Sequence, residues 1–411
     1  MHTRPGREFF ATVTVAEALA MLPTRAATRD ERVPVEAALG RVPVAPVRAP
    51  SALPGFARST VDGYAVRAAD TYGASEGLPS YLDVSGAVAM GRPAEVAVAP
   101  GHAVTVPTGG MLPDGADAVV MVEHTQETMP GTIEVVRAVA PGEGTVRADE
   151  DVAAGAQLVP AGRPLRPQDL GMLSAAGVTV LDVHARPVVG ILSTGDEVVV
   201  PGTDRLLPGQ VRDASAPALA GLVMEAGGDP MLLGVVPDDA TALEAALRAA
   251  VARCDGVVVS AGSSVGARDE TADVVARLGP PGILCHGLAI RPGKPTLLAK
   301  CGDVPVIGLP GNPLSAMVVF RLVGAPVVRR AGGCTQPPPE PSVPARLARQ
   351  VPSQAGRLDV VQVSLDGDVA HPVFGASALL SVLTGADGYV VVPEDATGLD
   401  AGAPVLVTLY R

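Results

Sequence analysis

The spacing of hydrophobic residues changes several times along this 411-residue chain. Apolar positions recur at helical spacing over residues 15–22, directly after the capping residue Thr14. A short helix is predicted before Gly40, and a longer one begins near Asp169 and ends at Gly177. We expect this longer helix to pack back against the N-terminal helix.

In two other stretches, short apolar runs alternate with turn residues. Residues 51–147 contain short Val-rich runs separated by Gly, Pro and Asp, which predicts a small β domain. A Pro-rich segment, GGCTQPPPEPSVP, follows the helical part of the chain, and the residues after it return to short strands with Gly turns. A second small β domain is therefore expected at the C-terminal end.

Residues 187–333 show a third pattern, in which apolar strand candidates alternate with helical stretches. The strand candidates are residues 187–195, 229–239, 254–262 and 303–311. Nearly continuous apolar strands that alternate with helices are typical of a parallel sheet covered on both faces. The predicted fold class is thus a multidomain α/β plus β protein with a central doubly wound α/β domain.

Composition narrows the possible functions. Hydrophobic residues make up 47% of the chain but aromatic residues only 2%, so the core must be built from Ala, Val and Leu. A formal charge of −12 argues against a general nucleic-acid or anionic-membrane surface. The four cysteines form no C-x-x-C pair, and no apolar run reaches the ~18 residues of a membrane span. We expect a cytoplasmic protein with reduced thiols and no membrane insertion.

Candidate chemistry gathers where the predicted strands end. Ligands of an open parallel sheet bind outside the carboxyl ends of its strands. Four loops stand there, at residues 193–197, 237–239, 260–269 and 308–313, and all are rich in Gly, hydroxyl or acidic residues. Such residues also cap helices in ordinary turns, but four converging loops favour a site. The glycines match neither the P-loop nor the dinucleotide-binding fingerprint, although the backbone of residues 262–266 could still hold a phosphate.

The sequence RPGKP sets Arg291 and Lys294 on either side of a rigid Pro-Gly turn, which suits an anion clamp as well as a plain surface turn. Only two of the 31 basic residues are lysines, and Lys294 is one of them. Nearby carboxylates would repel an anionic ligand by ~4 kcal/mol per close pair at an effective dielectric near 20. A divalent cation such as Mg²⁺ removes this conflict, because it binds one or two carboxylates together with substrate phosphates.

These residues resemble the molybdopterin molybdenumtransferases, the MoeA and gephyrin E-domain family. The motifs that carry the resemblance follow the family's order and cover nearly the whole chain: PGFARSTVDGYAV, VPTGGMLPDGADAVVMVE, ILSTGDEVV, SSVGARD, IRPGKP and GLPGNPLSA. The resemblance implies insertion of molybdenum from molybdate into adenylylated molybdopterin with Mg²⁺ or Zn²⁺, and release of AMP.

The resemblance also implies an arrangement of domains and subunits. The linker domain would comprise residues 13–50 and 148–186, the β domain 51–147, the molybdopterin-binding α/β domain 187–333 and the C-terminal β barrel 334–411. The subunits would form a homodimer. The active site would then lie between the α/β domain of one subunit and the β domain of the other.

The family motifs assign roles to particular residues. Asp62, Glu197 and Asp269 would be catalytic, and the last two would also hold the metal ion. Substrate would be bound by a larger set: Thr108, Asp151, Asp238, Ser260, Gly262, Ser264, Gly266, Arg291, Lys294, Pro310, Pro313, Arg357 and Ser377. The sequence departs from the family pattern at Ser215, where Asn is usual, and at Ala261, where Gly is usual.

Two other functions are consistent with the sequence. The α/β domain is similar to those of molybdopterin adenylyltransferases, although such an enzyme does not need the long β and linker segments. A dimeric scaffold for a partner protein, such as a molybdoenzyme or an adenylyltransferase, is the second alternative. The sequence does not distinguish molybdenum from tungsten as the metal that is transferred.

Overall fold

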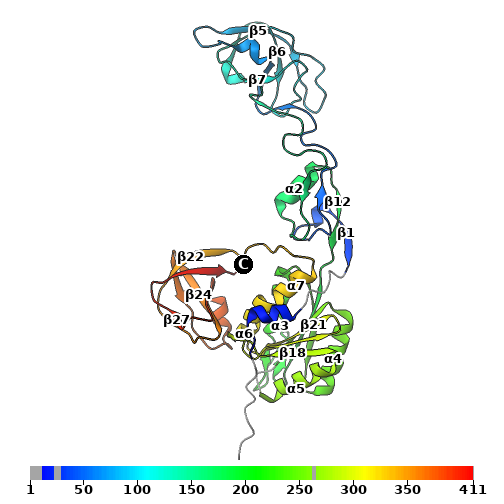
Figure 1. Ribbon diagram of the computed structural model, residues 1–411, viewed down its shortest axis with the longest axis vertical. Helices are drawn as coiled ribbons and strands as arrows, with labels where there is room; N and C mark the ends of the chain where they lie inside the picture. Colours follow the sequence, from blue (N-terminus) through cyan, green and yellow to red (C-terminus); the bar gives the residue numbers. More distant parts are fainter. Residues whose placement is uncertain (1–11, 23–28, 262–264, 411) are drawn as a thin grey trace, which may run out of the picture.

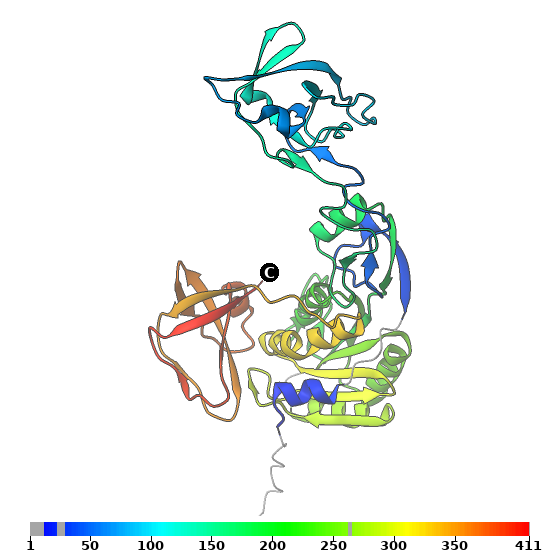
Figure 2. The same ribbon diagram turned by 45° about the horizontal axis from the view of Figure 1, so that its top comes forward.

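The computed structural model describes residues 12–22, 29–261 and 265–410. Figures 1 and 2 show an elongated chain with a β domain at one end and a small linker region in the middle. The α/β domain and the C-terminal barrel lie side by side at the other end. The chain therefore holds the β domain well away from the α/β sheet.

The β domain is a six-stranded curled sheet with the order β7-β4-β6-β5-β9-β8. Its strands are β4 (Gly63–Val66), β5 (Ser80–Ala87), β6 (His102–Val106), β7 (Ala118–Met121), β8 (Thr125–Met129) and β9 (Thr132–Val135). Apolar residues pack on both faces of this sheet, with Val66 and Ile133 in one cluster and Val104 and Val119 in the other. A Cβ atom at Gly63 would collide with the carbonyl oxygen of Val120, so only glycine lets β4 pair so closely with β7.

The linker region is built from segments on both sides of the β domain. Strand β1 (Asp30–Pro34) pairs antiparallel with β12 (Val180–His184), and β2 (Val47–Arg48) pairs with β11 (Gln157–Val159). Helix α2 (Pro167–Ala175) and the short helix η1 (Val35–Ala37) pack against these strands. The segment that enters the β domain and the segment that leaves it therefore lie next to each other.

The α/β domain contains a six-stranded sheet with the order β16-β13-β17-β21-β20-β18. Four neighbouring strands are parallel, namely β16 (Asp229–Val236), β13 (Val188–Thr194), β17 (Gly256–Ala261) and β21 (Val304–Pro310). Strand β20 (Leu297–Cys301) runs antiparallel to both β21 and β18 (Pro281–His286). The four predicted strands are thus parallel, as expected, and two antiparallel strands that the strand-helix alternation did not indicate, β20 and β18, extend the sheet at this edge.

Helices cover both faces of the α/β sheet, as predicted. Helices α3 (Ser215–Glu225), α6 (Pro313–Val319) and α7 (Ala325–Ala331) lie on one face, and α4 (Ala240–Arg253) and α5 (Val265–Arg277) on the other. Val258 and Ile307 point to the first face, and Val257 and Val306 point to the second. This alternation along fully buried strands explains why their sequences are almost continuously apolar.

Helix α1 (Val15–Met21) is capped by Thr14 and Glu17, each side chain bonding to the other residue's backbone. Ala18 and Leu22 belong to the core cluster of the α/β domain, where α1 contacts the π turn η4 (Phe320–Gly324). The expectation that α1 packs against α2 is therefore wrong, because its apolar face is buried by the α/β helices.

The C-terminal domain is a closed five-stranded barrel. Its strands pair in the circular order β24-β25-β22-β28-β26, and β26 pairs back with β24. Their bounds are β22 (Ser342–Leu347), β24 (Leu358–Asp366), β25 (Val369–Pro372), β26 (Gly388–Val392) and β28 (Pro404–Leu409). This barrel, together with the other domains, confirms the predicted fold class.

One further strand joins the two neighbouring domains. Strand β19 (Ile290–Arg291) leaves the α/β domain and pairs in parallel with the start of β24. Ile290 lies opposite Leu358 and Arg291 opposite Asp359, and we call this pairing the β19–β24 seam. The seam fixes the RPGKP turn against the barrel. Separately, no helix among the described residues is long and apolar enough to cross a membrane.

The linker region contains a buried ion pair that can be tested. Arg163 donates two hydrogen bonds to Asp169, at 2.8 and 2.9 Å, and the backbone N–H of Arg166 donates a third at 2.7 Å. Burial favours the protonated acid, but the hydrogen bonds from Arg163 and Arg166 outweigh it and hold the pKa of Asp169 well below its usual range. The carboxylate thereby ties the start of α2 to the preceding loop.

We expect Asp169→Ala to lower the free energy of unfolding by about 2–4 kcal/mol at pH 7. Because the folded pKa is depressed, this stability is fully present above the unfolded value of about 4 and is lost as the pH falls through the folded pKa. Urea unfolding at pH 7 and pH 3 should therefore show a difference between parent and variant that shrinks at pH 3.

Arg166→Ala is the matched control, since its side chain is 55% exposed and its ion pair contributes about 1 kcal/mol or less. If Asp169→Ala lowers the free energy of unfolding by the same amount at pH 7 and pH 3, the assigned charge interaction is contradicted.

Candidate functional site

Predicted site residues lie in a row along the carboxyl edge of the α/β sheet. The strand order places Asp238 after β16 at one side, Glu197 after β13 next to it, Ser260 near the end of β17, and Pro310 at the end of β21. Ser260 pairs in register with both neighbouring strands and is buried. The sheet thus brings residues together that are more than 100 positions apart in the sequence.

Carboxylates gather at the β16 and β13 side of this edge. The backbone N–H of Asp238 donates to Oδ1 of Asp196 at 3.1 Å. Partial desolvation of Asp238, followed by the negative charges of Asp196 and Glu197, raises the pKa of its carboxyl group. Within the described part of the chain, no three acidic, His or Cys side chains converge closely enough to hold a metal ion.

Several predicted residues fall at or near a gap in the description. Gly262 and Ser264 lie outside the described residues. Gly266 and Asp269 belong to helix α5, but the side chain of Asp269 is not among those described. Their predicted roles in phosphate and metal binding stay predictions.

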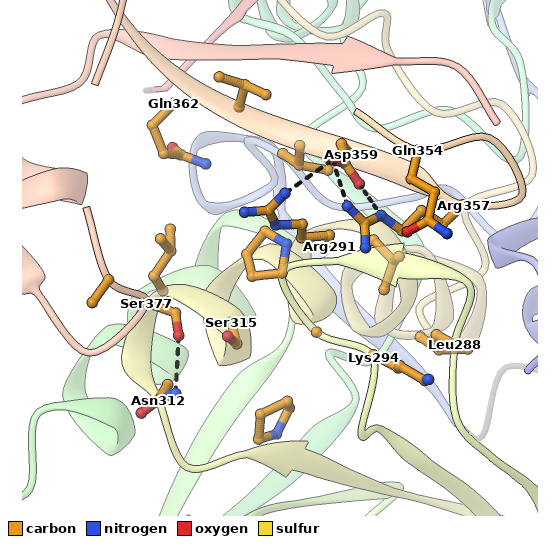
Figure 3. A pocket seen from close by; sticks show the side chains of 18 of the residues that line it. Leu288, Arg291, Lys294, Asn312, Ser315, Gln354, Arg357, Asp359, Gln362 and Ser377 are labelled. Carbon is orange, nitrogen blue, oxygen red and sulfur yellow. Dashed lines mark hydrogen bonds and ion pairs between the residues drawn. The ribbon is translucent and has the colours of Figure 1, made fainter. Parts of the chain in front are cut away.

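A cavity of about 1000 Å³ opens beside the β21 end of the sheet edge, between the α/β domain and the C-terminal barrel. We call it the interdomain cavity, and Figure 3 shows its side chains. Its walls include the RPGKP turn, the turn between β21 and α6, the start of β24 with residues 350–357 before it, and residues 373–377 after β25. Five predicted substrate residues line it: Arg291, Lys294, Pro310, Arg357 and Ser377.

The floor of the interdomain cavity contains a carboxylate that the sequence did not single out. Asp359 in β24 is only 3% exposed. Its Oδ1 accepts from Nε of Arg357 at 2.8 Å, its Oδ2 accepts from Nη2 of Arg357 at 3.3 Å, and Nη1 of Arg291 lies 3.7 Å from Oδ2. Figure 3 shows both guanidinium groups turned toward this carboxylate. A lone acid inside the apolar run LDVVQV was the sequence signal for it.

Ser377 joins the barrel to the start of α6. Nδ2 of Asn312 donates to Oγ of Ser377 at 2.9 Å, and the backbone N–H of Leu314 donates to the carbonyl oxygen of Ser377 at 3.3 Å. Asn312 lies within the loop 308–313 that the sequence indicated, but it was not named as a site residue. Pro313, the first residue of α6, is not among the residues that line the cavity.

The RPGKP turn is held by its backbone. Gly293 has a φ of +116°, and a Cβ atom there would collide with Val319, so glycine is required. The carbonyl oxygen of Lys294 accepts hydrogen bonds from Leu288 at 2.8 Å and from Thr296 at 2.9 Å. The Lys294 side chain is exposed at the cavity wall. The turn therefore presents its two cations from a fixed frame.

Asp62 and Thr108 lie together in the β domain. Oδ1 of the exposed Asp62 accepts from the backbone N–H of Thr108 at 2.7 Å and from its hydroxyl at 3.0 Å. These two hydrogen bonds, the backbone one first, lower the pKa of Asp62, so the carboxylate stays ionised. Neither residue lines the interdomain cavity of its own chain, and Asp151 is exposed in the linker, where its N–H donates to Leu53.

The two departures from the family pattern have structural explanations. Ser215 begins helix α3, and Asp213 accepts from the N–H groups of Ser215 and Ala216 at 3.0 Å each. Asp213 also accepts from the hydroxyl of Ser193 at 2.7 Å, so this acid ties β13 to α3. Ala261 ends strand β17, so its backbone is extended and needs no positive φ.

The fold and this cavity define a multidomain α/β protein with a cavity between two domains that is lined by cationic side chains. Residues 13–177 match the MoeA N-terminal region (domain I and II), residues 190–330 match the probable molybdopterin binding domain, and residues 344–410 match the MoeA C-terminal region (domain IV). The chain belongs to the MoeA family.

Relatives span nearly the same length. The chain is 34% identical to a molybdopterin molybdenumtransferase of Nostoc sp., covering 92% of this chain and 88% of the relative, and 31% identical to that of Bacillus subtilis, covering 93% and 90%. A crystal structure of the MoeA protein from Pyrococcus horikoshii OT3 superposes with a TM-score of 0.84 at 33% identity, over 97% of this chain and all of that one. The protein is accordingly a transferase of molybdenum cofactor biosynthesis.

The Asp62–Thr108 pair yields a prediction on acidity. Thr108→Val removes the hydroxyl donor and keeps the backbone N–H, so we expect the pKa of Asp62 to rise toward its ordinary value of about 3.9 without reaching it. A pH titration of the carboxyl ¹³C resonances measures this, with Asp62→Asn to identify the signal.

Thr105→Val is the matched control, because Thr105 is exposed on the neighbouring strand β6. If Asp62 has the same pKa in Thr108→Val as in the parent protein, the Thr108 hydroxyl does not contribute to the lowered pKa.

Proposed function

We propose that this protein inserts molybdenum from molybdate into adenylylated molybdopterin and releases AMP. The observation that carries the proposal is the interdomain cavity, in which Arg291, Lys294 and Arg357 face a common space beside the carboxyl edge of the sheet. Both substrates are anions, and a cavity of about 1000 Å³ is large enough for a pterin nucleotide.

The charge of the cavity supports an anionic ligand. Three cationic side chains and the carboxylate of Asp359 leave two net positive charges at its wall. Asp359 holds the planar guanidinium groups of Arg291 and Arg357 in place, which suits them to bind an oxyanion through paired N–H donors. Lys294 adds a compact positive charge from the opposite end of the RPGKP turn.

The carboxylates at the other end of the sheet edge fit a divalent cation. Partial burial first, and then the negative charges of Asp196 and Glu197, raise the pKa of Asp238. A cation between these carboxylates would relieve the repulsive part of this shift. Mg²⁺ needs only one or two carboxylates when substrate phosphates supply further oxygens, so Glu197 and Asp238, with Asp269, would hold it. When bound, Mg²⁺ or Zn²⁺ would neutralise charge on the phosphoanhydride that is cleaved.

Lys294 provides the sharpest test, because the chain has a matched control. In a purified assay with adenylylated molybdopterin and molybdate, we expect Lys294→Ala to slow AMP release by about 10- to 100-fold, the effect of losing a hydrogen bond to a charged group. Lys300, the other lysine, pairs with Asp303 at 3.0 Å on β20 outside the cavity, so Lys300→Ala should keep the parental rate. Equal rates for the two variants would contradict the proposal.

Asp62 enters the proposal through a second subunit. It is exposed, ionised and in the β domain, at the opposite end of the chain from the interdomain cavity. We infer that the chain forms a homodimer in which Asp62 of one copy faces the RPGKP turn of the other. The carboxylate would accept a proton from a thiol of molybdopterin as its sulfur binds molybdenum and pass it to the departing oxide, which leaves as water. The elongated shape supports this, because it leaves the β domain free to reach a partner.

Mixing two inactive variants tests the shared site. Asp62→Ala and Arg291→Ala homodimers should each be nearly inactive, but their co-expressed mixture should recover about a quarter of the parental AMP release. Half of randomly formed dimers are mixed, and each mixed dimer contains one intact site. A mixture as inactive as either variant alone would show that both residues act within one chain. An Asp62→Ala homodimer with the parental rate would show that Asp62 has no role.

The two alternatives predict other outcomes. An adenylyltransferase would form adenylylated molybdopterin from molybdopterin and ATP without molybdate. A scaffold would bind its partner protein but fail to restore molybdoenzyme activity in cells that lack the transferase. Running the purified assay with tungstate in place of molybdate identifies which oxyanion is used.

A further inference from the structure

Phe374 is the one aromatic side chain among the described residues that line the interdomain cavity. Its side chain is 54% exposed. The chain has only five Phe, five Tyr and no Trp, so a half-exposed ring at this cavity does not reflect a general surplus of aromatic residues. The apolar Leu379 and Leu380, also exposed, follow it in the same segment.

The segment that carries Phe374 is anchored on both sides. The backbone N–H of Val373 donates to the carbonyl oxygen of Gln362 at 2.8 Å, and Ser377 bonds to the start of α6 as described above. Gly375 lets the chain pass close to helix α8 (Leu380–Thr384), because a Cβ atom there would collide with Val382. The ring is therefore held at the cavity by a fixed backbone.

One face of the ring is already covered. The guanidinium carbon of Arg349 lies 4.6 Å from the ring centroid of Phe374, and Nη2 of Arg349 donates to the carbonyl oxygen of Pro372 at 2.7 Å. Arg349 is not among the residues that line the cavity, whereas Phe374 is. The guanidinium thus covers one face of the ring, so only the other face can take a planar ligand.

We propose that Phe374 is a stacking platform for the planar heteroaromatic ring of the ligand whose anionic groups are bound by Arg291 and Lys294. This inference rests on the proposed function, since adenylylated molybdopterin carries two such rings, adenine and pterin. Offset stacking on a rigid aromatic side chain needs only one free face, and it accepts any flat ring. Phe374 would thereby add affinity for anions that carry a flat ring, which a ring-free anion does not gain.

Binding of matched probes to the purified protein tests the platform. Dissociation constants are measured for AMP, for 6-hydroxymethylpterin phosphate and for ribose 5-phosphate, which carries the anion without a ring. We expect Phe374→Leu to weaken AMP, the pterin phosphate or both by about ten-fold and to change ribose 5-phosphate by less than two-fold. Phe374→Tyr, which keeps the ring, should bind all three like the parent.

Leu406→Ala is the control, because Leu406 is 61% exposed on the same barrel and does not line the cavity. Weakening of AMP alone assigns the platform to adenine, and weakening of the pterin phosphate alone assigns it to pterin. The inference is overturned if Phe374→Leu leaves all three dissociation constants unchanged, or if it weakens ribose 5-phosphate as much as the ring-bearing probes. It is also overturned if the parent binds AMP no more tightly than ribose 5-phosphate. The proposed function fails separately, if the parent releases no AMP in the transfer assay.

Discussion

The buried carboxylate of Asp359 is the constraint on which the cavity depends. An ionised acid that is 3% exposed is stable only with opposite charge beside it, and the structure supplies Arg357 from the barrel and Arg291 from the α/β domain. The same two residues, Arg291 and Asp359, lie opposite each other in the β19–β24 seam. One backbone pairing and one ion-pair cluster thus join the two domains at the cavity and orient its arginines, while apolar residues of the barrel pack on the α/β helices elsewhere in the junction.

The sheet edge then separates two kinds of charge. Acids follow β16 and β13, cations lie beyond the end of β21, and the end of β17 comes between them in the strand order. A ligand that spans this edge meets carboxylates at one end and guanidinium groups at the other. Such a division suits a substrate whose phosphates need a cation at one point and whose oxyanion needs direct donors at another.

Local patterns predicted much of this arrangement. Continuous apolar runs located β13, β16, β17 and β21, and the loops after them contain most of the predicted site. Long-range pairing could not be predicted from local patterns. The closure of the barrel, where β24 pairs with β26, and the burial of α1 on the α/β domain depend on partners farther away in the sequence. Asp359 was missed for the same reason, because its importance comes from Arg291, 68 positions earlier.

Diffraction from crystals soaked in molybdate tests the central claim most directly, since the anomalous signal of molybdenum locates the ion without assumptions about its ligands. The account predicts a peak inside the interdomain cavity, within hydrogen-bonding reach of Arg291 and Lys294. A peak found only at the acidic end of the sheet edge, or none within the cavity at saturating molybdate, would contradict it.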